Sequence, residues 1–191
     1  MWRSPIVTVA PAAEPLTTAD AKAHLRVDHS DDDALIAAYV AAARAHIEAR
    51  TGTRLFTQTV SVKTDDWNDM AVLPICPIQS VSSITYTDTD GALITLPTTV
   101  YEVRAEPLEP AVVLKYEQVW PTIRLGSLIT LTAVVGYGAA GAQPPELMHA
   151  MRLLAGDFYA QRETFSSGPV ASVPMAAAVD ALLCNHTKFL I

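Results

Sequence analysis

The sequence SDDDALIAAYVAAARAHIEARTGTR, from Ser30 to Arg54, contains the clearest helical pattern in the chain. Its apolar residues recur at steps of three and four, the spacing that places side chains on one face of a helix. These residues are Leu35, Ile36, Tyr39, Val40, Ala43 and Ile47. Ser30 can cap the helix, the aspartates after it suit the positive end of the helix dipole, and Gly52 can end it in the left-handed conformation. The stretch predicts a helix over 31–51 with one buried face.

The segment before it, LTTADAKAHLRVDH over residues 16–29, predicts a shorter helix over 17–25. Either Thr17 or Thr18 can supply the cap at its start. The polar link DHSDDD then leaves room for a turn. We therefore expect the two helices to pack against each other as a hairpin.

Residues 55–138 have a different character, because β-branched and aromatic residues alternate with polar ones between turn signals. The segment from Asp88 to Gly91 has the composition of a tight turn and predicts a hairpin. Prolines within 72–78 exclude a central strand there and favour an edge or connecting segment. The predicted strands cover residues 55–62, 81–86, 92–96, 100–104, 111–116 and 128–135. They form a small antiparallel β-insert of five or six strands.

A second long helix is predicted over residues 145–163, because Pro144, Pro145 and Glu146 suit a first turn. Its apolar stripe consists of Leu147, Met151, Leu154, Ala155 and Phe158. We expect this stripe to pack on the helix over 31–51. The fold class is therefore α+β, a helical hairpin or bundle with an inserted antiparallel β-unit and flexible terminal tails. The predicted organisation is an N-terminal arm (1–15), a single domain (16–165) and a C-terminal tail (166–191).

Length and composition indicate an ordinary globular protein, with 191 residues of which 50% are hydrophobic. Pro5 and Pro11 interrupt the short apolar run near the start, which argues against a secretory signal. No apolar stretch reaches the length of about 20 residues that crosses a bilayer, so we expect a soluble protein without a membrane partner. Cys76 and Cys184 belong to no metal-binding or redox motif, and are predicted to be reduced, partly buried thiols.

The net charge of −7 is concentrated in the predicted β-insert. Between Asp65 and Glu117 there are nine acidic residues and only two basic ones, Arg104 and Lys115. Proteins that hold DNA by its phosphates carry basic patches, and none is visible here. Tight DNA binding is therefore not expected. An acidic surface would suit a passage through which DNA slides, although a simply solvated acidic face explains the same composition.

Catalytic and cofactor motifs are missing from the sequence, which contains no nucleophile elbow, no phosphate-binding loop and no paired-histidine metal motif. His29 lies among aspartates, but without the ligand spacing of a calcium loop. The sequence therefore predicts no catalytic residue, no cofactor and no metal ion. Trp67 and Trp120 can serve either as lids on the core or as anchors of an interface. A small hydrolase or ligand-binding module, with Asp65, Asp69 and His149 around a pocket in the acidic β-insert, is the alternative from another class.

Several short motifs occur here in a characteristic order. Leu16–Thr17 precede the first helix, which is followed by Leu25–Val27, and the long helix ends with Ile47–Gly52. Further motifs are Leu73–Pro74, Val81–Tyr86, Asp90–Gly91, Tyr101–Val103, Val134–Gly138 and Pro145–Leu147. This order resembles the head-to-tail connector, or adaptor, family of long-tailed bacteriophages and phage-like gene transfer agents. The resemblance extends from about Leu16 to Glu163.

The resemblance implies a structural, non-enzymatic subunit of a virion or gene transfer agent particle. Such proteins form a ring, typically dodecameric, under the portal protein in the neck, where the ring extends the DNA channel and meets a stopper, head-completion or tail protein. Assembly in the bacterial cytoplasm follows from the same likeness. The family's C-terminal segment commonly reaches the portal, which here implies contacts by Leu182, Leu183, Asn185, His186, Lys188, Phe189, Leu190 and Ile191. A host protein-interaction module remains a third hypothesis.

Overall fold

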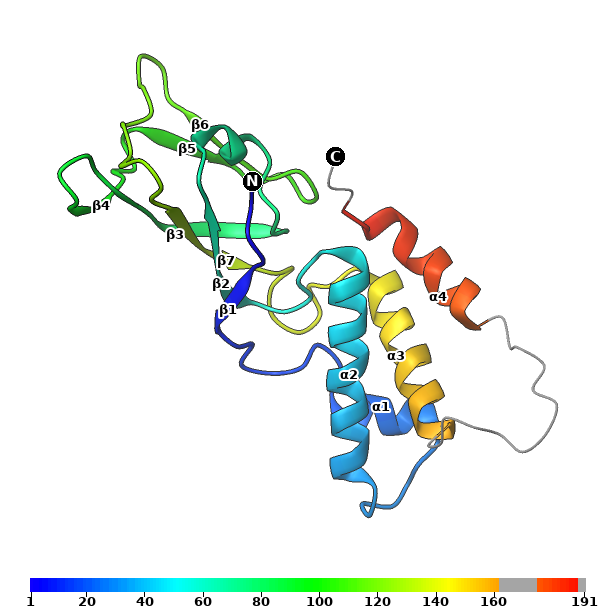
Figure 1. The fold of residues 1–191 in the computed structure, drawn as a ribbon. Coiled ribbons are helices and arrows are strands. Elements are labelled where there is room, and N and C mark those ends of the chain that lie inside the picture. The colour runs from blue at the N-terminus through cyan, green and yellow to red at the C-terminus, as the bar shows by residue number, and fades with distance from the viewer. Residues whose placement is uncertain (162–174, 189–191) are drawn as a thin grey trace. The chain divides into compact units, whose positions relative to one another are not determined.

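The structure is a computed structural model that describes residues 1–161 and 175–188 (Figure 1). The chain divides into two compact units. The sheet unit is built from Met1–Ala12, Gly52–Gly138 and Lys188–Ile191, and the helical unit from Ala13–Thr51 and Ala139–Thr187. The predicted α+β class with an antiparallel β-insert is confirmed. The division into an arm (1–15), one connector domain (16–165) and a tail (166–191) stays a prediction.

The helical unit contains four α-helices among the described residues. Thr17 caps the first of them, because its side chain accepts a hydrogen bond from the Asp20 amide at 3.1 Å. Arg26 ends this helix with a left-handed φ of 58°, a role that its residue type does not predict. The helices are α1 (Thr18–Leu25), α2 (Asp33–Thr51), α3 (Pro145–Ala160) and α4 (Met175–Leu183), and the short 3-10 helix η2 (Cys184–His186) follows α4.

The prediction that Ser30 caps α2 is wrong, because the helix begins at Asp33. The Ile36 amide donates to the Asp32 carbonyl at 2.8 Å, so Asp32 is the residue immediately before the first turn. The run from Ser30 to Asp33 offers several residues that can start a helix, and a distant contact selects among them. The Tyr159 hydroxyl donates to the Asp32 carboxylate at 2.6 Å. Gly52 ends the helix with φ +71°, as predicted.

The predicted packing of α3 on α2 is confirmed. Ile36 and Ile47 of α2 are fully buried, as are Leu147 and Met151 of α3. The rings of Tyr39 and Phe158 lie 6.2 Å apart between the same two helices. Gly156 faces α1, since a Cβ atom there would lie 3.6 Å from the Leu25 side chain. Burial of these two apolar faces holds the helical unit together.

The sheet unit contains a five-stranded antiparallel sheet in the order β1-β2-β7-β3-β4 and a separate pair, β5-β6. The strands are β1 (Ile6–Val9), β2 (Gln58–Thr64), β3 (Ile78–Thr87), β4 (Leu93–Thr95), β5 (Tyr101–Arg104), β6 (Ala111–Leu114) and β7 (Ile129–Val135). The central strand is β7, the segment with the strongest strand pattern. The strand β1 was not predicted, because its four residues gain order only by pairing Ile6 with Ser61 and Val7 with Val60.

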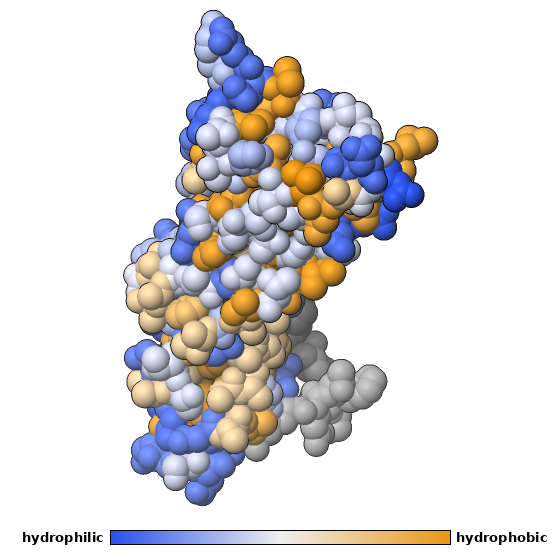
Figure 2. Space-filling view, turned by 90° about the vertical axis from the view of Figure 1, so that its left-hand side faces the viewer, coloured by the Kyte–Doolittle hydropathy of each residue, from blue (hydrophilic) through white to orange (hydrophobic). Residues whose placement is uncertain are grey.

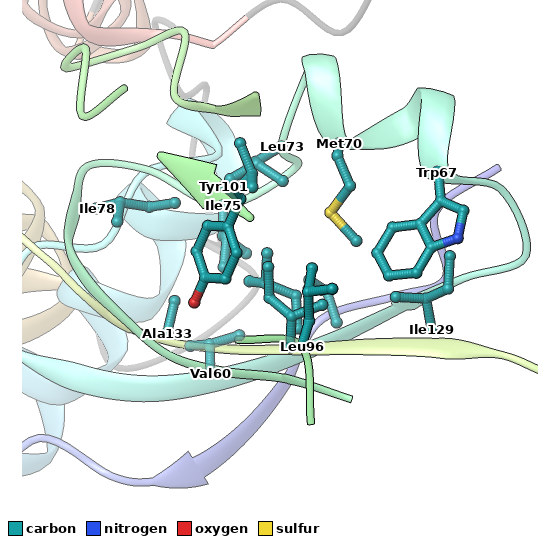
Figure 3. Packing of buried hydrophobic residues seen from close by; sticks show 14 of the residues in the cluster. Val60, Trp67, Met70, Leu73, Ile75, Ile78, Leu96, Tyr101, Ile129 and Ala133 are labelled. Atoms are coloured by element: carbon teal, nitrogen blue, oxygen red, sulfur yellow. The ribbon is translucent and has the colours of Figure 1, made fainter. Parts of the chain in front are cut away.

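One face of the five-stranded sheet forms the core of this unit (Figure 3). Burial alternates strictly along β7, where Ile129, Leu131, Ala133 and Val135 are buried and the residues between them are partly exposed. This alternation places every second side chain in the core. Met70 from the 3-10 helix η1 (Trp67–Ala71), together with Leu73 and Tyr101, covers the sheet.

Trp67 and Trp120 of the sheet unit stack on each other, with ring centroids 4.8 Å apart and an interplanar angle of 2°. Trp67 is only 8% exposed, and its indole nitrogen donates to the Pro121 carbonyl at 2.9 Å. Trp120 is partly buried against the same core. The stacked pair is therefore a lid on the core, which was one of the two predicted roles.

Gly136 ends β7 where the chain passes close to another backbone segment. Its φ is +115°, and a Cβ atom at this position would lie 2.3 Å from the Phe56 carbonyl oxygen. Only glycine combines this backbone conformation with the required space.

Among the described residues, no helix combines the length and apolar character needed to cross a membrane.

Leu131→Ala should lower the free energy of unfolding by about 2–5 kcal/mol, because it removes a fully buried side chain from the central strand. The matched control is Thr132→Ala on the opposite, partly exposed face of β7, with an expected loss of at most about 1 kcal/mol. Urea denaturation of the full chain measures both values. Equal losses would contradict the assignment of the two faces.

The two thiols should differ in reactivity. Cys76 is fully buried and burial raises its pKa, which the positive charges of Lys188 and Arg54 only partly oppose, whereas Cys184 is exposed. Because the thiolate is the reactive form, a thiol reagent near pH 8 should label Cys184 alone in the folded chain and both cysteines in denaturant. Mass spectrometry of the labelled chain measures the result, and rapid native labelling of Cys76 would contradict it.

Candidate assembly surfaces

The C-terminal residues predicted to contact a portal lie in different environments. Leu183 is only 1% exposed. Leu182, His186 and Lys188 are partly exposed, and Asn185 is exposed. Phe189, Leu190 and Ile191 lie outside the described residues. The structure therefore offers Leu182, Asn185 and His186 on a surface, whereas Leu183 is already packed within the helical unit.

Helix α4 packs on α3 rather than projecting from the helical unit. Val179 is 4% exposed, and Arg50 of α2 forms an ion pair with Asp180 at 3.3 Å. The His186 ring nitrogen lies 3.6 Å from a Glu146 carboxylate oxygen of α3. A hollow of about 470 Å³ between these helices is lined by His46, Arg50, Leu154, Asp157, Phe158, Val179 and Asp180. Residues 175–186 are therefore folded back onto the helical unit.

Lys188 lies in the sheet unit, at a groove of about 490 Å³. Its ammonium donates a hydrogen bond to the Leu73 carbonyl. Burial lowers the pKa of Lys188, while electrostatic interactions with Cys76 and Glu109 oppose this shift. We call this the Lys188 groove, and its lining residues are Ala71, Val72, Arg104, Glu106, Leu108, Glu109, Ala111 and Lys188.

The residues considered for a catalytic pocket do not form one. Asp65 and Asp69 both contact the Met1 ammonium, at 2.8 and 2.6 Å. His149 belongs to α3 and therefore to the other unit. Within residues 1–161 and 175–188, no three His, Cys, Asp or Glu side chains gather closely enough to hold a metal ion. The geometry does not support the hydrolase alternative.

Large apolar side chains are exposed in the loops of the sheet unit. Tyr116 is 89% exposed, Val119 78% and Leu125 101%, and Leu93 on the edge strand β4 is 74% exposed. Figure 2 shows hydrophobic groups separated by hydrophilic ones over the face of this unit that it presents. The sequence pattern did not identify these residues as a surface. The sequence does contain one indication of them. Several apolar residues lie between turn and loop residues, where they cannot all reach a core.

The exposed face of α2 is formed mainly by alanine. The exposed alanines are Ala34, Ala37, Ala38, Ala42, Ala45 and Ala49. The span also contains the exposed His46 and the partly buried Arg44, which forms ion pairs with Glu14 at 2.6 Å and Glu48 at 3.2 Å. Because the alanines carry neither charge nor bulk, another backbone can approach this face closely. Together with the exposed loops, α2 gives the chain two different apolar surfaces.

Comparison with protein families gives one match. Residues 16–92 match the model of the Phage gp6-like head-tail connector protein family. The resemblance to the head-tail connectors is confirmed. The match covers α1, α2, β2, η1 and β3, so the matched segment includes the helix that carries the alanine face. Among curated proteins, no sequence match is found.

Solved structures share the fold of this chain over nearly its whole length. A chain from the "Neck of empty GTA particle computed with C6 symmetry" has a TM-score of 0.81 at 23% identity, covering 99% of this chain and 97% of that chain. A chain from the "Virion of native gene transfer agent (GTA) particle" has a TM-score of 0.82 at 24% identity, with the same coverage. A third, from the "Neck of native GTA particle computed with C12 symmetry", has a TM-score of 0.79 at 24% identity. These similarities show that the shared fold extends well beyond residues 16–92.

Val179→Asp should release α4 from α3, because it places a charge at a position that is only 4% exposed. The expected cost is several kcal/mol, on the order of the penalty for an unpaired buried charge. Ala177→Asp, at an exposed position in the same helix, is the matched control. Hydrogen exchange of residues 175–186 measures the effect, and unchanged protection in Val179→Asp would contradict the packing of α4.

Proposed function

We propose that this chain is a structural head-tail connector subunit of a phage or gene transfer agent particle. It acts under the portal, where it extends the DNA channel and joins the capsid to a stopper, head-completion or tail protein. The observation that carries the proposal is the match of residues 16–92 to the head-tail connector family. The likeness of the whole fold to neck chains of gene transfer agent particles supports it. The proposed role requires contacts between proteins and no chemical step.

We propose that the subunits form a ring, with twelve copies as the expected number. The similar neck structures were computed with sixfold and twelvefold symmetry. A ring needs two different patches on each subunit, because each copy meets one neighbour with one patch and the next neighbour with the other. The alanine face of α2 and the exposed loop residues around Tyr116 and Leu125 meet this requirement.

The C-terminal residues are proposed to contact the portal. Asn185 and His186 follow α4 on the surface of the helical unit, and Leu182 near the end of α4 is partly exposed. In this proposal Leu183 positions the helix from within the unit. Lys188, Phe189, Leu190 and Ile191 complete the portal-contacting segment.

The charge distribution supports a ring through which DNA passes without being bound tightly. The acidic excess between Asp65 and Glu117 would repel phosphates and so favour sliding over binding. We propose that the ring is assembled in the bacterial cytoplasm and remains in the particle neck. A host protein-interaction module would instead be absent from purified particles, so copurification with the particle separates the two functions.

Removal of residues 166–191 should abolish attachment to the portal, since it deletes the whole proposed contact. Because this deletion also removes α4, the double variant Asn185→Ala with His186→Ala provides a milder test at surface positions. It should weaken portal binding roughly tenfold, equivalent to about 1.4 kcal/mol. Thr89→Ala, at an exposed turn of the sheet unit, is the control.

Co-sedimentation with purified portal rings measures binding, and electron microscopy of particles shows whether the chain occupies the neck. If the deletion variant binds as tightly as the full chain, the portal role of the C-terminal residues is wrong. If the chain is absent from particle necks, the connector function itself is wrong.

A further inference from the structure

The outer face of the five-stranded sheet, opposite its core, is formed mainly by hydroxyl side chains. Along β2 and β7, buried residues alternate with partly or fully exposed ones, and the exposed ones point to this outer face. Residues directly opposite each other in an antiparallel ladder share a face, so the register extends the outer face to β3 and β4. We call it the hydroxyl face, and its hydroxyl residues are Thr59, Ser61, Ser80, Ser83, Thr85, Thr87, Thr95, Thr130 and Thr132.

Thr132 of the central strand β7 lies in the middle of this face. It is paired with Ser61 of β2 on one side and with Ser83 of β3 on the other. Beyond Ser61 the same row ends at Ile6 of the edge strand β1. Leu93 lies on the opposite edge strand, β4. Ile6 is 59% exposed and Leu93 is 74% exposed, so apolar side chains flank the hydroxyl rows at both edges of the sheet.

The hydroxyl face differs in charge from the rest of the sheet unit. The five strands of the sheet contain no aspartate or glutamate, and Lys63 of β2 is their one charged residue. The nine acidic residues between Asp65 and Glu117 all lie outside these strands, in η1, in β5 and in loops. A polyanion can therefore approach this face without meeting a carboxylate on it.

This composition suits a hydrated surface better than a protein interface. The cores of protein interfaces are depleted in serine, and burying hydroxyl groups without hydrogen-bond partners costs free energy. Tight DNA binding needs several cations that displace counterions, whereas this face carries Lys63 alone. Serine and threonine hydroxyls can still donate hydrogen bonds to phosphate oxygens. The face therefore permits weak contacts with DNA and no tight binding.

We propose that the hydroxyl face lines the DNA channel and that duplex DNA is the molecule that passes it. This inference rests on the proposed function, to which it adds the surface of the subunit that faces the DNA. The apolar edges at Ile6 and Leu93 then lie to either side, where a ring places the neighbouring subunits. Asp88 and Asp90, in the turn after β3, add negative charge at one end of the face and further disfavour tight binding.

A positive charge placed on the face should hinder the passage of DNA. Thr132→Lys adds one such charge per subunit, and a ring repeats it around the channel. Because each added cation strengthens the attraction to phosphates, gene delivery per DNA-containing particle should fall roughly tenfold or more. Gene transfer to recipient cells measures delivery, and electron microscopy of the same particles shows whether the chain occupies the neck.

Two control variants separate charge on the face from other effects. Thr132→Gln enlarges the same side chain without adding charge. Thr99→Lys adds the same charge at an exposed position in the loop between β4 and β5, off the hydroxyl face. Particles with either control should deliver DNA as efficiently as particles with the unchanged chain.

Several results would overturn the inference. One is normal delivery by Thr132→Lys particles whose necks are occupied, and another is an equal loss of delivery in either control. Loss of the Thr132→Lys chain from the necks would identify the face as a protein contact and would also overturn it. Absence of the unchanged chain from the necks would instead contradict the proposed function itself.

Discussion

The contact between α2 and α3 is the interaction on which the organisation of the chain depends. The apolar stripe of α2 packs against α3, and the Tyr159 hydroxyl reaches Asp32 across a separation of 127 residues. This contact brings α2 and α3, which are separated in sequence by the whole of residues 52–144, together in one helical unit. Residues 52–138 lie between α2 and α3 in the sequence. They belong to the sheet unit and not to the helical unit.

In the sheet unit, only one face of the five-stranded sheet packs into the core, and several large apolar side chains of the loops remain exposed. The strict alternation along β7 fills the core with every second residue. Loop residues such as Tyr116 and Leu125 lie outside this pattern and remain exposed. A chain that exposes large apolar groups on loops and small ones on α2 is suited to contacts with other subunits. The features of the described residues that suit binding are therefore these exposed apolar surfaces.

The sequence predicted the elements with strong internal patterns and missed those that depend on distant partners. Helix α2, helix α3, the β3–β4 hairpin and strand β7 all have periodic or turn signals of their own. Strand β1 does not, since its four exposed residues become a strand only beside β2. The start of α2 was misplaced for a similar reason, because several neighbouring residues could cap it and a contact with Tyr159 distinguishes Asp32.

By itself the sequence determined the α+β class, the buried faces of the long helices and the resemblance to the head-tail connectors. These follow from hydrophobic periodicity and from the order of short motifs, both of which are local properties of the chain. Only the tertiary structure decided that α4 packs on α3, that Trp67 and Trp120 form a core lid, and that Lys188 lies at a groove in the sheet unit. Each of these depends on residues far apart in sequence, whose proximity is set by the way the apolar faces are buried together.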